Sequence, residues 1–127
     1  MRLVIVRHAE AASGHPDELR TLTPEGREQA RRLGERLRAA GIAPDAVLCS
    51  PLLRARETAR GLGLGEPEVD DRLAPGATPD DVRAAVEGRG ATVVVVGHQP
   101  DCGRAAAALG GGSEPHFPPA GHTTVEL

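Results

Sequence analysis

Two histidines in this chain each follow a short apolar run. Residues 3–6 lead directly into Arg7 and His8, and the valines at 93–96 lead, after one glycine, into His98. Continuous apolar runs of this length are typical of strands that are buried on both faces of a parallel sheet. Ligands of open α/β sheets bind at the carboxyl ends of the strands. The sequence therefore places an arginine and two histidines where a ligand is expected.

A third apolar run, at 46–49, supplies a further cation. It is followed by Ser50 and Pro51, and then by a helical pattern that carries Arg54. If the three strands are neighbours, Arg54 meets the residues that follow the other two strands. Two guanidinium groups around one point suit a phosphate, because arginine binds its oxygens in a bidentate manner. Helices that begin at Pro51 and Pro100 would add backbone N–H donors.

A histidine among arginines is suited to one kind of covalent chemistry. An imidazole nitrogen can attack phosphorus and form a phosphohistidine. Nearby positive charges disfavour the imidazolium form, which keeps the ring of His8 neutral and nucleophilic. The same charges stabilise the phosphoryl oxygens during transfer. The pattern predicts phosphoryl transfer to His8, followed by hydrolysis of the intermediate by water.

Metal binding and an ordinary structural role are the alternative interpretations of the two histidines. His8 and His98 could be metal ligands, but adjacent arginines repel a cation and no third ligand is apparent, so no metal is expected. Either could also be an ordinary residue at a strand end. The clustering of both with two arginines favours function, because perturbed groups gather at functional sites. The remaining histidines, His15, His116 and His122, have no partner pattern and are expected to be surface or loop residues.

Composition limits the classes of protein. With 127 residues, 39% hydrophobic and 26% charged, one soluble domain over residues 1–127 is expected. A formal net charge of −3 offers no basic surface for nucleic acid. No apolar run reaches the roughly 20 residues that span a bilayer, and no signal-peptide pattern precedes Arg7. We therefore expect a cytoplasmic protein without a membrane partner. Cys49 and Cys102 are too few for a disulfide framework, and we expect inert thiols.

The spacing of apolar residues predicts the elements. Strands are expected at 2–6, 46–49 and 92–96, with a weaker one at 123–127. A helix is expected after the start signal Thr23-Pro24-Glu25, with an apolar stripe of Gly26, Ala30, Leu33, Leu37 and Ala40. Further helices are expected after Pro51, over 78–87 and after His98. Alternating strands and helices predict an α/β fold with a mostly parallel sheet flanked by helices.

Four segments within residues 1–100 carry a resemblance to a known family. They are Arg7-His8-Ala9-Glu10-Ala11, Arg20-Thr21-Leu22-Thr23-Pro24-Glu25-Gly26 with Gln29-Ala30, Ser50-Pro51-Leu52-Leu53-Arg54-Ala55-Arg56-Glu57-Thr58-Ala59, and Val96-Gly97-His98-Gln99-Pro100. Their order and spacing resemble the histidine phosphatase superfamily, in its small SixA-type phosphohistidine phosphatase branch. The tail Pro118-Pro119-Ala120-Gly121 also fits that branch. The resemblance implies a phosphoglycerate mutase-like fold.

The resemblance also implies roles for matching positions. His8 would be the phosphorylated nucleophile, and Arg7, Arg54 and His98 would bind and stabilise the phosphoryl group. Arg20 would be a further phosphate or substrate contact. The implied activity is a metal-independent phosphatase that needs no cofactor. Its partner would be a phosphorylated protein or a small phosphorylated substrate, and the chain is expected to be a monomer or weak dimer.

Two departures from the family pattern bear on the mechanism. Ala9 replaces the signature glycine, which matters only if that position needs a positive φ. No convincing acid for the leaving group is apparent, and the candidates rest on proximity alone: Glu10, Asp80, Asp81 and Asp101. A missing acid favours labile donors such as phosphohistidine, because imidazole is a better leaving group than an alkoxide. Arg56 cannot share a helix face with Arg54 and is not expected in the site.

Three functions stay open at this point. The first is hydrolysis of protein phosphohistidine, which suits an open site beside the short loop at 9–22. The second is a general small-molecule phosphomonoesterase or mutase, although 127 residues leave little room for the inserted loops that retain a mutase intermediate. The third is a phosphate-binding regulatory module without catalysis. Turnover distinguishes the third from the first two.

Overall fold

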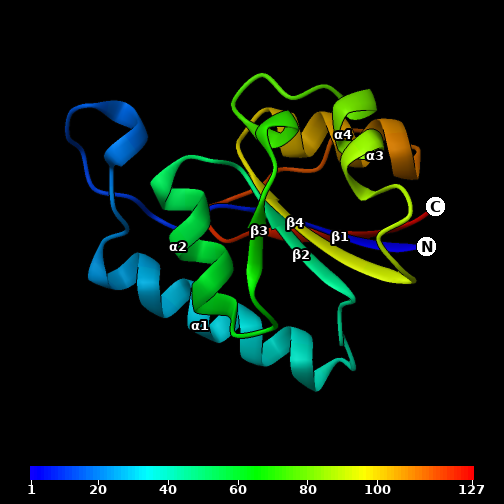
Figure 1. Cartoon of the computed structure of the whole chain (residues 1–127), viewed down its shortest axis with the longest axis horizontal. Coiled ribbons are helices and arrows are strands. Elements are labelled where there is room, and N and C mark those ends of the chain that lie inside the picture. The colour runs from blue at the N-terminus through cyan, green and yellow to red at the C-terminus, as the bar shows by residue number, and fades with distance from the viewer.

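A five-stranded sheet with helices on both faces forms the protein, and the computed structural model describes all residues 1–127 (Figure 1). The strands are β1 (Arg2–Arg7), β2 (Ala46–Cys49), β3 (Pro67–Val69), β4 (Thr92–Gly97) and β5 (His122–Glu126). The α-helices are α1 (Pro24–Ala39), α2 (Leu53–Leu62), α3 (Pro79–Val86) and α4 (Asp101–Gly110), and short 3₁₀ turns lie at η1 (Asp17–Leu19) and η2 (Asp71–Leu73). No helix is both long and apolar enough to cross a membrane.

The strand order β3-β2-β4-β1-β5 makes the three predicted neighbours adjacent. β4 lies between β1 and β2 and is parallel to both, while β5 runs antiparallel along β1. Arg7 pairs with Gly97, and Cys49 pairs with Val96. The three strands therefore end together at one edge of the sheet, and the segments that follow them emerge side by side.

Each face of the sheet packs against its own pair of helices. Helices α3 and α4 cover one face, and α1 and α2 cover the other (Figure 1). Leu3 and Ile5 of β1 belong to the core beneath α3 and α4, whereas Val4 and Val6 belong to the core beneath α1 and α2. The pattern repeats in β4, where alternate valines enter the two cores. This two-sided burial explains why the predicted strands contain no polar alternation. It also anchors both histidine-bearing segments to strands that are inaccessible to solvent.

Several boundaries differ from the sequence-based expectation. The edge strand β3 was not predicted, because it has only three residues and its side chains are largely exposed. α2 begins at Leu53 rather than at Pro51, because Leu52 is extended (φ −69°, ψ 140°), and α4 begins at Asp101. Ala40 was predicted on the buried stripe of α1, but it is the exposed C-cap residue of that helix.

Gly26 brings the start of α1 against the segment that follows the first histidine. A Cβ atom at this position would lie 2.0 Å from the carbonyl oxygen of Glu10, so any side chain would displace that backbone. The helix is capped by Thr23, whose hydroxyl accepts the Gly26 N–H at 2.9 Å. The same Thr23 donates its backbone N–H to the Glu10 carbonyl at 3.0 Å. The glycine in the predicted stripe thus serves a close backbone approach.

Candidate active site

His8 lies immediately beyond β1 and has one free ring nitrogen. Its backbone N–H donates to the carbonyl of Gly97 at 2.9 Å, which continues the pairing of β1 and β4 past the strand end. The ring Nδ1 lies 2.7 Å from the carbonyl oxygen of Ala9. A carbonyl oxygen only accepts, so Nδ1 carries the proton and Nε2 is left with an unshared electron pair. Nε2 is therefore the nucleophilic atom of this ring.

The surroundings of His8 favour its neutral form. Burial is the main cause that lowers the pKa of His8 below 6.5, and the positive charges of Arg54, Arg7 and Arg20 lower it further. The hydrogen bond to the Ala9 carbonyl acts in the opposite direction but is outweighed. At neutral pH the ring is therefore unprotonated at Nε2, as the proposed attack on phosphorus requires.

His98 lies beside His8, with ring centroids 5.3 Å apart. It is only 5% exposed, and its Nε2 lies 2.8 Å from the hydroxyl oxygen of Ser50. Burial, followed by the nearby His8 and Arg54, lowers the pKa of His98 to about 4. Ser50 Oγ already accepts the N–H of Leu52 at 3.2 Å, so its own proton is free to be donated to His98. His98 is thus a neutral, fixed hydrogen-bonding group.

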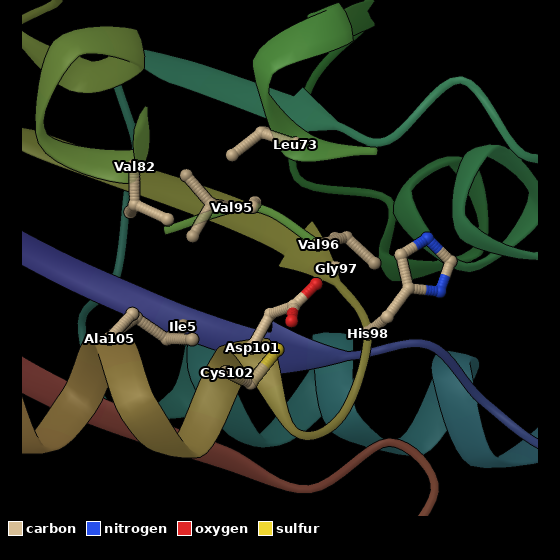
Figure 2. A pocket seen from close by; sticks show the side chains of 11 residues that line it. Ile5, Leu73, Val82, Val95, Val96, Gly97, His98, Asp101, Cys102 and Ala105 are labelled. Atoms are coloured by element: carbon tan, nitrogen blue, oxygen red, sulfur yellow. The ribbon is translucent and has the colours of Figure 1, made fainter. Parts of the chain in front are cut away.

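A small apolar cavity lies beside His98. Figure 2 shows Ile5, Val82 and Val95 on its walls, with the His98 ring at one end. Asp101 and Cys102, at the start of α4, also line it. The Asp101 carboxylate accepts the backbone N–H of Gly76 at 2.8 Å and so ties α4 to the loop before α3.

Arg7 and Arg54 each contribute a buried donor without a partner. Arg7 Nη1 donates to the Phe117 carbonyl at 2.9 Å, and Arg54 Nη1 donates to the Asp17 carbonyl at 3.0 Å. The Nε atoms of both arginines are buried and make no hydrogen bond. Buried donors without partners are rare and costly. Two of them on guanidinium groups whose charges both act on His8 indicate an anion site.

Arg20 reaches the same region from the loop between β1 and α1. Its Nε donates to the Ala12 carbonyl at 2.8 Å, and its Nη1 donates to Asp17 Oδ1 at 3.1 Å. Asp17 Oδ2 in turn accepts from Arg54 Nη2 at 3.3 Å. This loop was expected to leave the site open. It does not do so entirely, because η1 places Asp17 against Arg54.

Two side chains of α2 fix the positions of these groups. Thr58 is fully buried, and its hydroxyl accepts the Ala9 N–H at 2.9 Å while donating to the Arg54 carbonyl at 2.7 Å. Glu57 accepts from the Thr21 hydroxyl at 2.6 Å and from the Leu22 N–H at 2.8 Å. The segment after His8 and the segment after Arg20 are thus both attached to the helix that carries Arg54.

The structure brings together all five predicted site residues: Arg7, His8, Arg20, Arg54 and His98. Arg56 is exposed, as expected. Ala9 does not need the freedom of glycine, because the only non-glycine residue with positive φ is Ala120 (φ 59°).

The structure gives none of the four carboxylates considered as the acid for the leaving group a contact with His8. Asp81 forms the capping box of α3, Asp101 is held by Gly76, and Glu10 and Asp80 are exposed. Sequence reasoning missed Asp17, whose only local signal is its spacing of three residues before Arg20 on one short turn. It also gave Ser50 no role beyond starting a helix, although Ser50 contacts His98.

Sequence relatives are found in bacteria. A protein of Picosynechococcus sp. is 36% identical over 127 residues, covering 91% of this chain and 77% of the relative. A protein of Mycobacterium tuberculosis is 39% identical over 100 residues, covering 75% of this chain. This chain spans 63% of the length of the mycobacterial relative.

Solved structures resemble the whole chain. The protein histidine phosphatase SixA, complexed with tungstate, has a TM-score of 0.90 at 29% identity, covering 100% of this chain and 88% of that one. A structure assigned as phosphohistidine phosphatase SixA of Nakamurella multipartitia has a TM-score of 0.85 at 32% identity, covering 97% and 82% of the two chains. The family model of the histidine phosphatase superfamily (branch 1) matches residues 3–77, which include His8, Arg20 and Arg54. This chain therefore belongs to the histidine phosphatase superfamily, branch 1.

Proposed function

We propose that this protein is a metal-independent phosphatase that hydrolyses protein phosphohistidine through a covalent intermediate on His8. The observation that carries the proposal is the unprotonated Nε2 of His8 within reach of the positive charges of Arg54, Arg7 and Arg20. Arg7 and Arg54 also each carry a buried Nε–H without a partner. A phosphoryl group placed against Nε2 would be stabilised by these positive charges.

The first step is attack of His8 Nε2 on phosphorus. A bond forms between Nε2 and phosphorus, and the bond from phosphorus to the leaving nitrogen breaks, so the leaving ring keeps that electron pair. Arg7 and Arg54 donate to the non-bridging oxygens, where charge accumulates during transfer. His98 is held beside His8 and supplies a further neutral contact. Arg20 adds positive charge at the outer side.

The second step is hydrolysis of the phosphohistidine. Water attacks phosphorus, the bond to Nε2 breaks, and both protons of the water leave with the inorganic phosphate as H2PO4⁻, which ionises further in solvent. His8 regains its electron pair on Nε2, and the Ala9 carbonyl keeps the other nitrogen protonated throughout. Each residue therefore ends in its starting state, and no metal takes part in either step.

The choice of phosphohistidine over phosphate esters is supported by the side chains around the site. Of the four carboxylates considered from the sequence, Asp81 and Asp101 already accept hydrogen bonds within the fold, and no contact places Glu10 or Asp80 against His8. An ester would need an acid at its leaving oxygen, because an alkoxide is a poor leaving group. Imidazole leaves readily without one. Similarity to proteins called phosphohistidine phosphatases gives independent support for this substrate class.

The test compares two substrates in the presence of EDTA: a phosphohistidine peptide and p-nitrophenyl phosphate. The wild type is expected to prefer the peptide, and His8→Ala is expected to lose turnover of both. His116→Ala, at an exposed loop position, is the matched control and keeps wild-type rates. Equal or better rates on the aryl ester would instead identify a general phosphomonoesterase. No turnover of either substrate would identify a phosphate-binding module.

A further inference from the structure

Asp17 occupies the outer end of an otherwise buried arginine. The side chain of Arg54 is 8% exposed, whereas that of Asp17 is 61% exposed. The two are joined by Arg54 Nη2 and Asp17 Oδ2 at 3.3 Å, while the Nε of Arg54 stays buried and unpartnered. One guanidinium group thus has a buried Nε–H without a partner and an outer N–H that donates to a carboxylate. Asp17 therefore lies at the mouth of the phosphoryl site.

Asp17 is an ionised carboxylate with spare acceptor capacity. Its hydrogen bond from Arg20, followed by the charge and hydrogen bond of Arg54, lowers the pKa of Asp17 below its ordinary value. It is therefore a poor proton donor at neutral pH. Its two oxygens accept one side-chain hydrogen bond each, at 3.1 Å from Arg20 and at 3.3 Å from Arg54. A carboxylate accepts about four, so lone pairs remain for a further donor.

The charge of Asp17 reaches the inner part of the site. It acts on His98 in the opposite direction to the arginines, favouring positive charge there. A cationic group that enters the mouth beside Arg54 and His98 therefore meets one fixed negative charge. The inner part of the same site is positive. The site consequently offers opposite charges to the two ends of a bound phosphoryl donor.

We propose that Asp17 binds the leaving group, by accepting the N–H of the substrate's phosphorylated imidazole ring at the nitrogen that is not bonded to phosphorus. This inference rests on the proposed function and names the residue that selects phosphohistidine within it. Asp17 acts as an acceptor and not as an acid. It holds the substrate ring in its protonated, cationic form.

The proton balance explains why no acid is needed at the leaving atom. When the far nitrogen of the substrate ring carries a proton, cleavage of the bond to phosphorus returns an electron pair to the near nitrogen. The ring then departs as neutral imidazole, with its one proton already on the far nitrogen. Without that proton it would depart as an imidazolide anion, which is a far poorer leaving group. Stabilising the far N–H therefore accelerates the step without a proton transfer.

The same carboxylate disfavours other substrates. A phosphate ester whose alcohol bears a carboxylate, such as 3-phosphoglycerate, would place like charges together at the mouth. An aryl phosphate has a leaving group without an N–H and gains nothing from Asp17. The expected order of preference is phosphohistidine, then aryl phosphate, then a carboxylate-bearing phosphate.

The experiment removes the charge of Asp17 and keeps its shape. Asp17→Asn is compared with Glu18→Gln, which removes one charge from an exposed neighbour on the same turn. Three quantities are measured for each variant: kcat/KM on a phosphohistidine peptide across pH, kcat/KM on p-nitrophenyl phosphate, and inhibition by inorganic phosphate. Phosphate occupies the phosphoryl site and has no leaving group, so it reports on the arginines alone.

Asp17→Asn is expected to lower kcat/KM on the peptide by about tenfold or more, and on the aryl ester by much less. Inhibition by phosphate should be unchanged or stronger. The basic limb of the pH profile on the peptide should move to lower pH, because the substrate ring loses its proton more easily. Glu18→Gln should leave all three quantities unchanged.

Two results would overturn the inference. Equal losses on both substrates, with weaker phosphate inhibition, would show that Asp17 merely orients Arg54 and Arg20. Unchanged preference and an unchanged pH profile would show that it does not touch the leaving group. A wild type that hydrolyses the aryl ester but not the peptide would contradict the proposed function itself, before any variant is compared.

Discussion

The Thr58 hydroxyl joins the backbone N–H of Ala9, the residue after His8, to the carbonyl of Arg54, with distances of 2.9 and 2.7 Å. All three groups are buried. Thr58→Val keeps the shape of the side chain but leaves the Ala9 N–H without a partner. We expect a loss of about 1–3 kcal/mol in the free energy of unfolding, and a fall in kcat as the segment that carries His8 loosens.

Urea unfolding followed by circular dichroism checks the first part, and steady-state kinetics at saturating substrate checks the second. Thr124→Val is the matched control, because Thr124 is exposed on β5. An unchanged free energy of unfolding in Thr58→Val would show that the Ala9 N–H finds another partner.

The free energy of unfolding is expected to decrease as the pH is lowered, because of His98. Its pKa is 6.5 in the unfolded chain and about 4 in the folded protein, so between these values the unfolded state binds more protons. The free energy of unfolding therefore decreases as pH falls from about 6.5 to about 4, by on the order of 2–3 kcal/mol from this group. His8, whose pKa is also lowered, contributes in the same direction.

His98→Gln should reduce this dependence on pH. Urea titrations at pH 7.0 and 4.5 measure it, and the difference between the two should be smaller in the variant by on the order of 2 kcal/mol. His116→Gln, at an exposed position, should keep the wild-type difference. The same slope in His98→Gln and wild type would place the acid sensitivity elsewhere.

A methyl group at Gly26 should disturb the site from outside it. The Cβ would fall 2.0 Å from the Glu10 carbonyl oxygen, so Gly26→Ala must shift either α1 or the segment that follows His8. We expect a loss of about 1–3 kcal/mol in the free energy of unfolding together with lower kcat/KM. Gly14→Ala is the control, since nothing lies within 4 Å of its Cβ position. Equal melting temperatures in the two variants would contradict the close approach.

The thiols of Cys49 and Cys102 should be unreactive in the folded protein. Burial raises the pKa of Cys49 to about 11 and that of Cys102 to about 12, so neither forms a thiolate at neutral pH. Ellman's reagent should therefore react with neither until urea unfolds the chain, and activity should be the same with and without reductant. Rapid modification of the native protein would show that one of the two cores opens readily.

The sheet and the arginine–histidine cluster could be predicted because their signals are local. The apolar runs before Arg7 and His98 specify strands buried on both faces, and parallel strands must end at a common edge. His8 and His98 each directly follow the last residue of a strand, so the strand fixes where each histidine lies. Their convergence therefore followed once the strands were taken as neighbours.

The parts that were missed depend on contacts between distant segments. Asp17 meets Arg54 across 37 residues, and Ser50 meets His98 across 48, so neither contact leaves a pattern in the neighbouring sequence. The strand β3 was missed for another reason. It is short and exposed, so it lacks the apolar run by which strands were recognised.

Because β4 lies between β1 and β2 in the sheet, the residues of the candidate site come from segments that are far apart in the sequence. The stretch 3–77 contains His8 and Arg54, yet it lacks the strand that separates and aligns the two segments that bear them. The Gly97 carbonyl that accepts from His8 belongs to this strand, and the Phe117 carbonyl that accepts from Arg7 comes from later in the chain. No single segment of the chain therefore contains the whole site. The geometry of the site is a property of the assembled sheet as a whole.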